Sequence, residues 1–580
     1  MTELRVETLR LPVAELGELN PLPPLAGPLE SPFTLDTSGL PASIVRGTRY
    51  GHVPHLMPYL TQDGYGRDRR PGELRTAVLE NDVLRAEFAL TLGGRLWSLR
   101  HKPSGRELVY RNQVFQPANL ALRNAWFSGG VEWNIGTRGH SPTTCAPLHA
   151  GVVSGPGGTP MLRMWQWERL RSVAFGVDAW LDGGLLLVHV RIRNPNPETV
   201  PMYWWSNIAV EQTEGVRVLA PASSAYRTTY DGRLAEVPTP GEPDHTYPAQ
   251  APYAADFFFR VPDSEQPWIA ALDGTGHGLF QTSTGRLRGR KLFVWGRSAG
   301  GRHWQDWLSG GGQEYLEIQA GLAATQYEHV PMPAGASWSW VEAYGLASVD
   351  PAASHGTDWS AAVGATGTAV RQLAPEATLD AALAAAVGLA DTPPTELLQV
   401  GDGWGALERR RRALTGEPAP DSPGTPYPDA TLTDEQSPYA ALLDTGELPP
   451  ADPATPPAGY VTGPDWRRRL AGAESSWHSR LLLGVAAHAE GDLVAARQAY
   501  TESLAHVRTP WALRNLALLE TGDARADLLL RACELAPRLR QLTTEAGEAL
   551  LQADRPADAL ALLDRAPEPV RRHGRTRLLA

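Results

Sequence analysis

The chain has 580 residues, a formal charge of −11 and an isoelectric point near 5.8. Such an acidic chain lacks the basic face that neutralises nucleic-acid phosphates, so we expect no nucleic-acid partner. Its two cysteines, Cys145 and Cys533, give no disulfide framework. The acidic start MTELRVETLRLPVAELGELN is unlike a signal peptide, and a run of about 18 apolar residues, as a membrane span needs, is absent from the sequence. We therefore expect a cytoplasmic protein with no membrane partner.

Composition divides the chain into two parts. The chain contains 57 Gly and 50 Pro, and 15 of its 19 Trp precede residue 360, which is typical of many strands joined by turns. From about residue 375 the chain is rich in Ala, Leu and Arg, which favour helices. The basic run Arg409 to Arg412 lies in this helical part and predicts a solvated helix end.

The first part predicts an all-β domain over residues 76–350. Residues 1–75 contain Pro-rich turns and short extended pieces, which we expect to pack on it as strands and loops. Apolar and polar residues alternate from Leu84 to Leu90, as in a half-buried strand, and Gly93-Gly94 turns the chain into the next strand. Further strands are expected at 185–193, 202–211, 268–272, 291–295, 315–320 and 338–344. Because no helical pattern separates them, the sequence predicts an antiparallel sandwich.

The second part predicts a strap and a repeat array. Residues 351–465 form a helical and Pro-rich connection, with 12 prolines between Gly416 and Trp466. Residues 466–580 contain a degenerate repeat of about 34 residues, as in tetratricopeptide helices. The repeat positions are Gly484, Gly491, Ala496 and Tyr500, then Gly522, Ala532 and Pro537, then Gly547, Ala559 and Ala566.

Four segments combine aromatic, amide and carboxylate groups, three of them on the polar face of a strand and the one around Glu132 on a turn or strand end after Gly129-Gly130. Side chains alternate along a strand, so Leu316 and Ile318 face the core while Tyr315, Glu317 and Gln319 share the other face. The other segments contribute Glu132, Trp133 and Asn134, then Tyr203, Trp205, Asn207 and Glu211, and finally Glu342. Aromatic rings pack on the C–H faces of a pyranose and carboxylates accept its hydroxyls, so these faces indicate a sugar site.

Two motifs resemble galactose-mutarotase-like domains. The turn Leu-Gly-Gly-Arg-Leu-Trp-Ser-Leu at 92–99 resembles their opening hairpin, and Tyr315 to Gln319 resembles the segment that carries their general base. The resemblance implies a β-supersandwich with Glu317 as the base. At the strand where those enzymes carry their general acid histidine, this chain has Ser206-Asn207. Across most of its length, including Gly-Gly-Val-Glu-Trp-Asn at 129–134, Glu-Ile-Gln-Ala-Gly at 317–321 and Trp-Ala-Leu-Arg-Asn-Leu-Ala at 511–517, the chain resembles an uncharacterised bacterial family that pairs this sandwich with C-terminal tetratricopeptide repeats.

The leading hypothesis is a carbohydrate-active enzyme that hydrolyses a glycosidic bond with Glu317 and Glu132 as its carboxylate pair. His140 is a candidate for the missing acid, and Trp304 is a further candidate for sugar stacking. An aldose 1-epimerase-like isomerase is the second hypothesis. A non-catalytic sugar sensor, whose repeats bind a protein partner, is the third. We expect no cofactor, since no Cys or His spacing suggests zinc; a calcium ion held by loop oxygens stays open.

Overall fold

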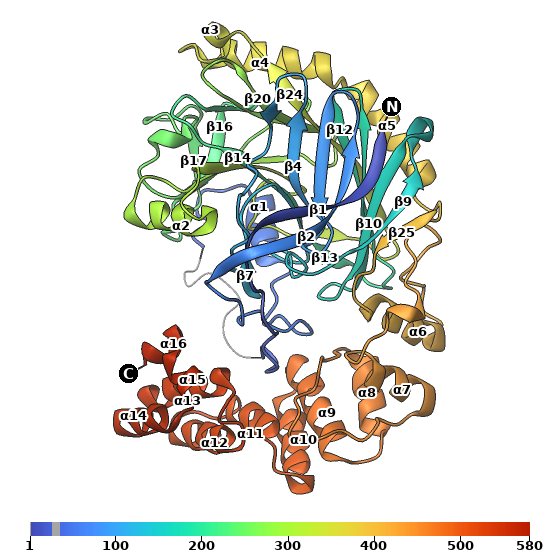
Figure 1. Ribbon diagram of the computed structural model, residues 1–580, viewed down its shortest axis with the longest axis vertical. Helices are drawn as coiled ribbons and strands as arrows, with labels where there is room; N and C mark the ends of the chain where they lie inside the picture. Colours follow the sequence, from blue (N-terminus) through green and yellow to red (C-terminus); the bar gives the residue numbers. More distant parts are fainter. Residues whose placement is uncertain (1, 26–34, 580) are drawn as a thin grey trace. The chain divides into compact units, whose positions relative to one another are not determined.

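A computed structural model describes residues 2–25 and 35–579 (Figure 1). The chain forms two compact units. The β unit comprises the described parts of 1–17, 30–53 and 65–431, and the helical unit comprises those of 18–29, 54–64 and 432–580. Residues 26–34, which belong to the N-terminal stretch expected to pack as strands and loops, lie outside the described residues.

The β unit contains two large antiparallel sheets and two small ones. In spatial order the first sheet is β1 (Glu3–Ala14), β2 (Arg69–Glu80), β3 (Leu84–Ala89), β4 (Arg95–His101), β8 (Val131–Ile135), β14 (Trp204–Glu211), β22 (Tyr315–Gly321), β21 (Gly289–Val294), β18 (Ala255–Phe259), β16 (Ser224–Thr228) and β17 (Ala235–Pro238), with β5 (Arg106–Glu107) beside β4. The second is β15 (Arg217–Leu219), β19 (Trp268–Leu272), β20 (His277–Ser283), β24 (Ser337–Ser348), β12 (Leu185–Arg193), β11 (Val173–Asp182), β10 (Pro160–Glu168), β9 (His149–Ser154) and β25 (Glu396–Gln399). The small sheets are β13 (Val200–Met202) with β23 (Val330–Met332), and β6 (Ala118–Ala121) with β7 (Asn124–Trp126).

The apolar faces of the two large sheets share one core. Leu316 and Ile318, predicted to face inward, are fully buried there together with Phe88 and Ile208. Each such side chain gains about 1.5–3 kcal/mol from leaving water. Because the period of a strand is two, this burial turns the intervening residues of β14 and β22 to the opposite face of the first sheet.

Glu342 lies inside this core rather than at a surface that a sugar could reach. It is fully buried and accepts hydrogen bonds from Ser206 Oγ (2.7 Å), Tyr344 OH (2.7 Å), Gln281 Nε2 (3.0 Å) and Trp340 Nε1 (3.2 Å). Burial raises the pKa of the Glu342 carboxyl. The sequence placed this residue on a sugar-binding face because alternation cannot tell which face of a sheet meets another sheet.

Six helices belong to the β unit: α1 (Ala42–Arg49), α2 (Ala299–Ser309), α3 (Pro351–Ser354), α4 (Trp359–Leu373), α5 (Glu376–Leu389) and α6 (Trp404–Thr415). Helices α4 and α5 cover the outer face of the second sheet (Figure 1). Val370 and Leu379 form a cluster there with Trp180 and Phe280 of the sheet.

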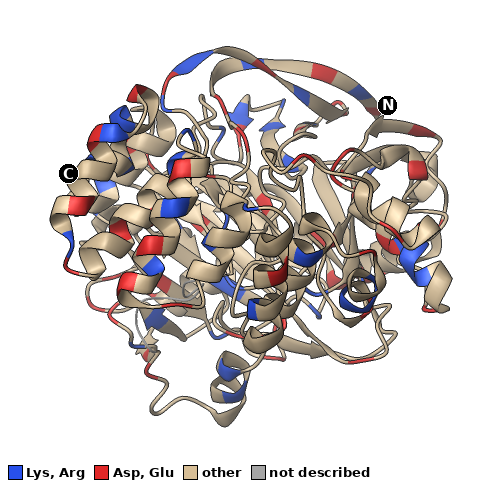
Figure 2. Cartoon of the chain, turned by 90° about the horizontal axis from the view of Figure 1, so that it is seen from below, with Lys and Arg blue, Asp and Glu red and all other residues tan. Residues whose placement is uncertain are grey.

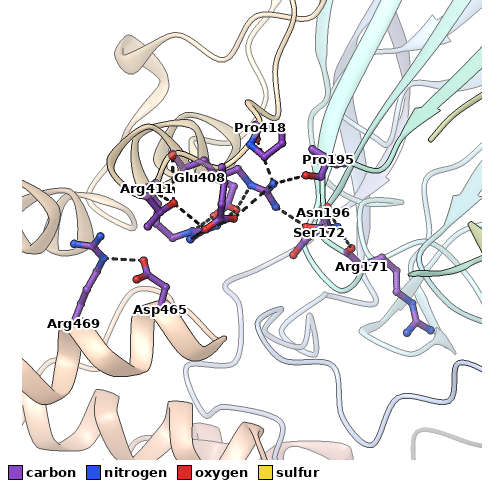
Figure 3. A network of polar contacts seen from close by, with 12 residues as sticks. Arg171, Ser172, Pro195, Asn196, Glu408, Arg411, Pro418, Asp465 and Arg469 are labelled. Carbon is purple, nitrogen blue, oxygen red and sulfur yellow. Dashed lines mark hydrogen bonds and ion pairs between the residues drawn. The ribbon is translucent and has the colours of Figure 1, made fainter. Parts of the chain in front are cut away.

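Helix α6 is anchored to the sandwich by the basic run (Figure 3). Arg412 is 2% exposed and donates to Asn196 Oδ1 (2.6 Å), the Pro195 carbonyl (3.1 Å) and Glu408 (2.6 Å). The prediction of a solvated helix end is therefore wrong for Arg412. Glu408, four residues earlier, neutralises the charge of Arg412, but the acceptors that tie it to the sandwich come from a loop more than two hundred residues earlier, which the local pattern does not reveal.

The helical unit contains α7 (Ser437–Thr445), α8 (Pro464–Gly472), α9 (Trp477–Ala489), α10 (Leu493–His506), α11 (Pro510–Ala517), α12 (Gly522–Leu535), α13 (Arg540–Gln552), α14 (Pro556–Arg565), α15 (Glu568–Arg572) and α16 (Gly574–Arg577). A Cβ on Gly484 of α9 would lie 2.4 Å from the Tyr500 ring of α10, so only glycine permits this packing. Its helices carry interspersed charges of both signs (Figure 2). The expected fold class, an antiparallel β-sandwich followed by a helical array, is confirmed.

Among the described residues, the helices fall short of the length and hydropathy that crossing a bilayer requires.

We expect Arg412→Met to lower the free energy of unfolding of the β unit by about 1–3 kcal/mol, since it leaves the Pro195 carbonyl and Asn196 Oδ1 without their buried donor while Glu408 keeps its bonds from Arg411. Urea unfolding followed by tryptophan fluorescence measures this change. Arg10→Met is the matched control, because Arg10 forms an exposed pair with Glu73 that contributes little. Equal effects of the two substitutions would contradict the anchoring role of Arg412.

Candidate functional site

The strand register aligns a row of polar side chains across the first sheet. Asn207 of β14 lies opposite Glu132 of β8 on one side and Gln319 of β22 on the other. Gln319 in turn lies opposite Lys291 of β21. Residues directly opposite in an antiparallel ladder share a face, and Glu317, two residues from Gln319, shares it as well. The core on the other face thus turns these five side chains outward together.

A cavity of about 590 Å³ lies over this row. Its volume is in the range of small-ligand sites. Its aromatic walls are Trp126, Tyr230, Phe293, Trp295, Trp304 and Tyr327. Its polar lining includes Asn134, Arg138, His140, Asn207, Asp256, Lys291, Ser298, Glu317, Gln319 and Gln326. Flat rings beside amides and charged groups suit a ligand with both C–H faces and hydroxyls.

Glu132 lies beneath the cavity wall, 4% exposed, and its two oxygens are saturated. Oε1 accepts from Thr144 Oγ1 (2.6 Å) and pairs with Arg95 (3.2 Å). Oε2 accepts from Trp126 Nε1 (3.0 Å) and Asn134 Nδ2 (3.3 Å) and lies 2.8 Å from His140 Nδ1. Burial alone would raise the pKa of Glu132, but the charges of His140 and Arg95 and the bonds from His140 and Thr144 lower it well below its usual range.

This environment keeps Glu132 ionised, so it cannot donate a proton to a leaving group at neutral pH. It is also not among the residues that line the cavity in the described part of the chain. The arrangement therefore does not support the hydrolytic pair of Glu317 and Glu132. What Glu132 can do is orient its neighbours.

His140 is the neighbour that Glu132 orients into the cavity. The bond to Glu132 assigns the proton of the neutral ring to Nδ1 and leaves Nε2 for a ligand. The imidazole packs on Trp126 with ring centroids 4.5 Å apart. To act as an acid, His140 would carry a proton on both nitrogens, with Nδ1–H donated to Glu132 and Nε2–H directed to a ligand.

Glu317 is the carboxylate that the cavity exposes to a ligand, although it is only 5% exposed. Gln319 Nε2 donates to its Oε2 at 3.0 Å. Burial raises the pKa of Glu317, and nearby Glu132 adds to this effect, whereas the positive charges of His140 and Lys291 oppose it. A carboxylate with a raised pKa is a stronger base than an exposed one.

Besides Glu317, the cavity contains the ion pair of Lys291 with Asp256 and the side-chain amide of Asn207. Lys291 Nζ lies 2.7 Å from Asp256 Oδ1, and Tyr230 OH donates to Asp256 Oδ2 at 2.8 Å. Asn207 is 6% exposed, and its Oδ1 has no hydrogen-bond partner in the described residues. A buried acceptor without a partner carries a desolvation cost that a ligand hydroxyl would remove.

The cavity brings together six of the residues predicted from sequence: Asn134, His140, Asn207, Trp304, Glu317 and Gln319. The others lie elsewhere. Trp133 belongs to the core between the sheets, and its indole donates to the Gly94 carbonyl. Glu211 is exposed at the end of β14. Trp205, Tyr203 and Tyr315 point to the correct side of their strands but are buried under loops and neighbouring aromatic rings.

Sequence reasoning missed Lys291, Asp256, Tyr230, Gln326 and Tyr327. The segment Lys291 to Trp295 was predicted as a strand. Lys291, Phe293 and Trp295 share one face of it, and the lysine on that face indicates that the face lies outside the apolar core. The Asp256–Lys291 pair depends on β18 lying beside β21, which the local sequence does not encode.

Comparison with known proteins shows the fold and leaves the activity open. The profile of a family described as a domain of unknown function (DUF5107) matches residues 52–334. A TPR-domain containing protein from Parabacteroides distasonis is 17% identical, with a TM-score of 0.64 over 97% of this chain and 86% of that one. This likeness extends over both the sandwich and the helical array.

Two further solved structures match about half of the chain. A galactose mutarotase-like protein from Clostridium acetobutylicum is 10% identical, with a TM-score of 0.34 over 47% of this chain and 95% of that one. A putative aldose 1-epimerase from Klebsiella pneumoniae is 13% identical, with a TM-score of 0.38 over 51% of this chain and 84% of that one.

We expect Glu317→Gln to stabilise the protein increasingly above pH 4. Below about pH 4.3, the usual Glu pKa, folded and unfolded chains both hold this proton and the substitution changes little. At higher pH the unfolded chain releases the proton more readily than the folded chain, whose Glu317 pKa is raised, so the native protein loses stability that a glutamine retains. A gain in Tm of about 1–4 °C at pH 8 is expected by calorimetry. Glu211→Gln is the control, and a Tm gain independent of pH would contradict the assignment.

Proposed function

We propose that the protein is an aldose 1-epimerase-like isomerase that interconverts the anomers of a sugar bound in the cavity. The observation that carries the proposal is the pairing of a raised-pKa carboxylate, Glu317, with a carboxylate-oriented imidazole, His140, in one aromatic-walled cavity. The two are close enough that the charge of His140 acts on the Glu317 carboxyl. The names of the mutarotase-like and epimerase-like relatives agree with this chemistry.

In the proposed reaction Glu317 removes the proton of the anomeric hydroxyl while His140 Nε2 gives its proton to the ring oxygen. The bond from the anomeric carbon to the ring oxygen breaks, and a carbonyl forms at that carbon. The open-chain sugar rotates about the adjacent carbon–carbon bond. The ring oxygen then attacks the other face of the carbonyl, His140 takes back its proton, and protonated Glu317 returns the proton to the new hydroxyl.

The surrounding residues support each role. Glu132 holds the imidazole in one orientation, and Gln319 holds the Glu317 carboxylate. Asn207 Oδ1 would accept from a sugar hydroxyl, and Trp126 and Trp304 would pack on the ring. Positioning of this kind replaces the chance encounter of sugar, acid and base in solution.

The similarity to the TPR-domain containing protein along 97% of the chain supports a second part of the proposal. We infer that sandwich and repeats form one conserved architecture, as in an uncharacterised bacterial family pairing a mutarotase-like domain with C-terminal repeats. In that architecture the cavity binds the carbohydrate, and the repeats take no part in the reaction.

We expect the wild-type protein to accelerate exchange between the α and β anomers of at least one aldose in a panel, measured by magnetisation-transfer NMR. Glu317→Gln and His140→Gln should each lower kcat/KM by about 10²–10⁴, the usual contribution of a general base or acid. Glu211→Gln, which alters an exposed carboxylate outside the cavity, should retain wild-type kinetics.

Wild-type rates in the Glu317→Gln and His140→Gln variants would remove these residues from the mechanism. Sugar binding without accelerated exchange by the wild-type protein would instead identify a non-catalytic sugar sensor. Release of reducing sugar from glycosides would restore the hydrolytic hypothesis.

A further inference from the structure

The helical unit holds extended chain through donors aimed at backbone carbonyls. Trp477 of α9 and Trp511 of α11 stand one repeat period of about 34 residues apart. Their indoles donate to the carbonyls of Ala451 (3.2 Å) and Pro453 (3.1 Å), two residues apart in the Pro-rich segment. Equivalent positions of successive repeats therefore bind alternate carbonyls of one extended segment.

A second extended segment, residues 18–25, is held in the same way. Tyr460 OH donates to the Pro21 carbonyl at 3.1 Å, and Arg514 of α11 donates to the Pro23 carbonyl at 2.7 Å. Arg514 is 5% exposed and is fixed by two bonds of 2.8 Å to Glu545 of α13. A backbone carbonyl can accept two hydrogen bonds, and that of Pro23 also accepts from the amide of Leu25 at 2.9 Å.

A third segment, residues 54–64, completes the set. His55 Nε2 lies 2.8 Å from the Ala489 carbonyl at the end of α9. At the start of α13, Arg540 donates to the Asp63 carbonyl (3.0 Å) and Gln541 donates to the Asp63 carboxylate (2.8 Å). The two N-terminal segments also bond to each other, from the amide of residue 20 to the carbonyl of residue 61 at 2.9 Å.

The described residues directly before the third segment, 35–53, belong to the β unit and support a wall of the cavity. The amide of His329 donates to the Gly47 carbonyl of α1 at 3.3 Å. A Cβ on Gly47 would lie 2.9 Å from Cγ of Glu328, and one on Gly51 would lie 2.9 Å from the His329 ring, so both contacts are close. The preceding residues of this loop, Gln326 and Tyr327, line the cavity.

We propose that the helical unit is an intramolecular clamp. It binds the chain's own segments 18–25 and 54–64, and by holding 54–64 it limits movement of the residues directly before that segment, where α1 braces the cavity wall at 325–329. The occupant of this binding surface is the protein's own N-terminal chain. The inference rests on the proposed function only in treating the cavity as a sugar site, and amide exchange tests the clamp without any sugar.

Hydrogen exchange of the full-length protein without sugar provides the test. Asp63→Ala removes the side-chain contacts of residues 540 and 541, and the double substitution Arg540→Ala with Gln541→Ala removes them from the other side. Either should speed amide exchange of 54–64, 42–49 and 325–329 by about two- to tenfold, the factor expected for one or two lost polar contacts. Arg497→Ala is the matched control, since it breaks an ion pair with Glu520 of the array that touches neither segment.

Wild-type exchange at 42–49 and 325–329 in both variants would overturn the proposal, whether or not 54–64 is released. Protection of α9 and α10 amides must persist in at least one variant. Its loss in both would also overturn the proposal, since the segments would then belong to the core of the array and not be held by it. Faster exchange of these amides supports the clamp even if a sugar still binds normally. Normal binding would show only that release of the segments does not alter sugar affinity.

Discussion

The arrangement of the cavity depends on one buried ion cluster centred on Glu132. A carboxylate that is 4% exposed needs charge and hydrogen bonds to remain ionised, and here Arg95, Thr144, Trp126 and Asn134 supply four partners. The fifth is His140, and the same bond that satisfies the carboxylate fixes the tautomer and direction of the imidazole. The acid of the proposed reaction is thus positioned by the requirement to neutralise a buried charge.

The sandwich places the base by an independent constraint. Burial of Leu316 and Ile318 between the sheets directs Glu317 and Gln319 outward, and the register of β14, β22 and β21 brings other polar groups alongside. Desolvation then raises the pKa of the Glu317 carboxyl. The two carboxyls therefore have opposite pKa shifts. The pKa of Glu132 is lowered because hydrogen-bond donors surround it, whereas that of Glu317 is raised because it faces a cavity with few donors. This divergence separates an orienting group from a reacting one.

How far the sequence predicts this site depends on the range of the contacts involved. Alternation along single strands was enough to place Glu317, Gln319 and Asn207, because it reflects local geometry and one buried face. It could not separate a cavity wall from a covered aromatic cluster, so Trp205 was expected at the sugar site.

The role of Glu132 was missed for a related reason. Its donors come from several separate elements, and their convergence exists only in three dimensions. The Asp256–Lys291 pair and the anchoring of Arg412 were missed in the same way, since each joins elements remote in sequence. The helical repeats were visible because their period is local, whereas their N-terminal occupants were not.

A crystal structure of the full-length protein with a bound aldose tests the central claim most directly. The account predicts the sugar in the 590 Å³ cavity, with its anomeric hydroxyl about 2.6–3.2 Å from the Glu317 carboxylate and its ring oxygen at a similar distance from His140 Nε2. A sugar bound elsewhere, or one whose anomeric centre lies out of reach of both groups, would contradict it.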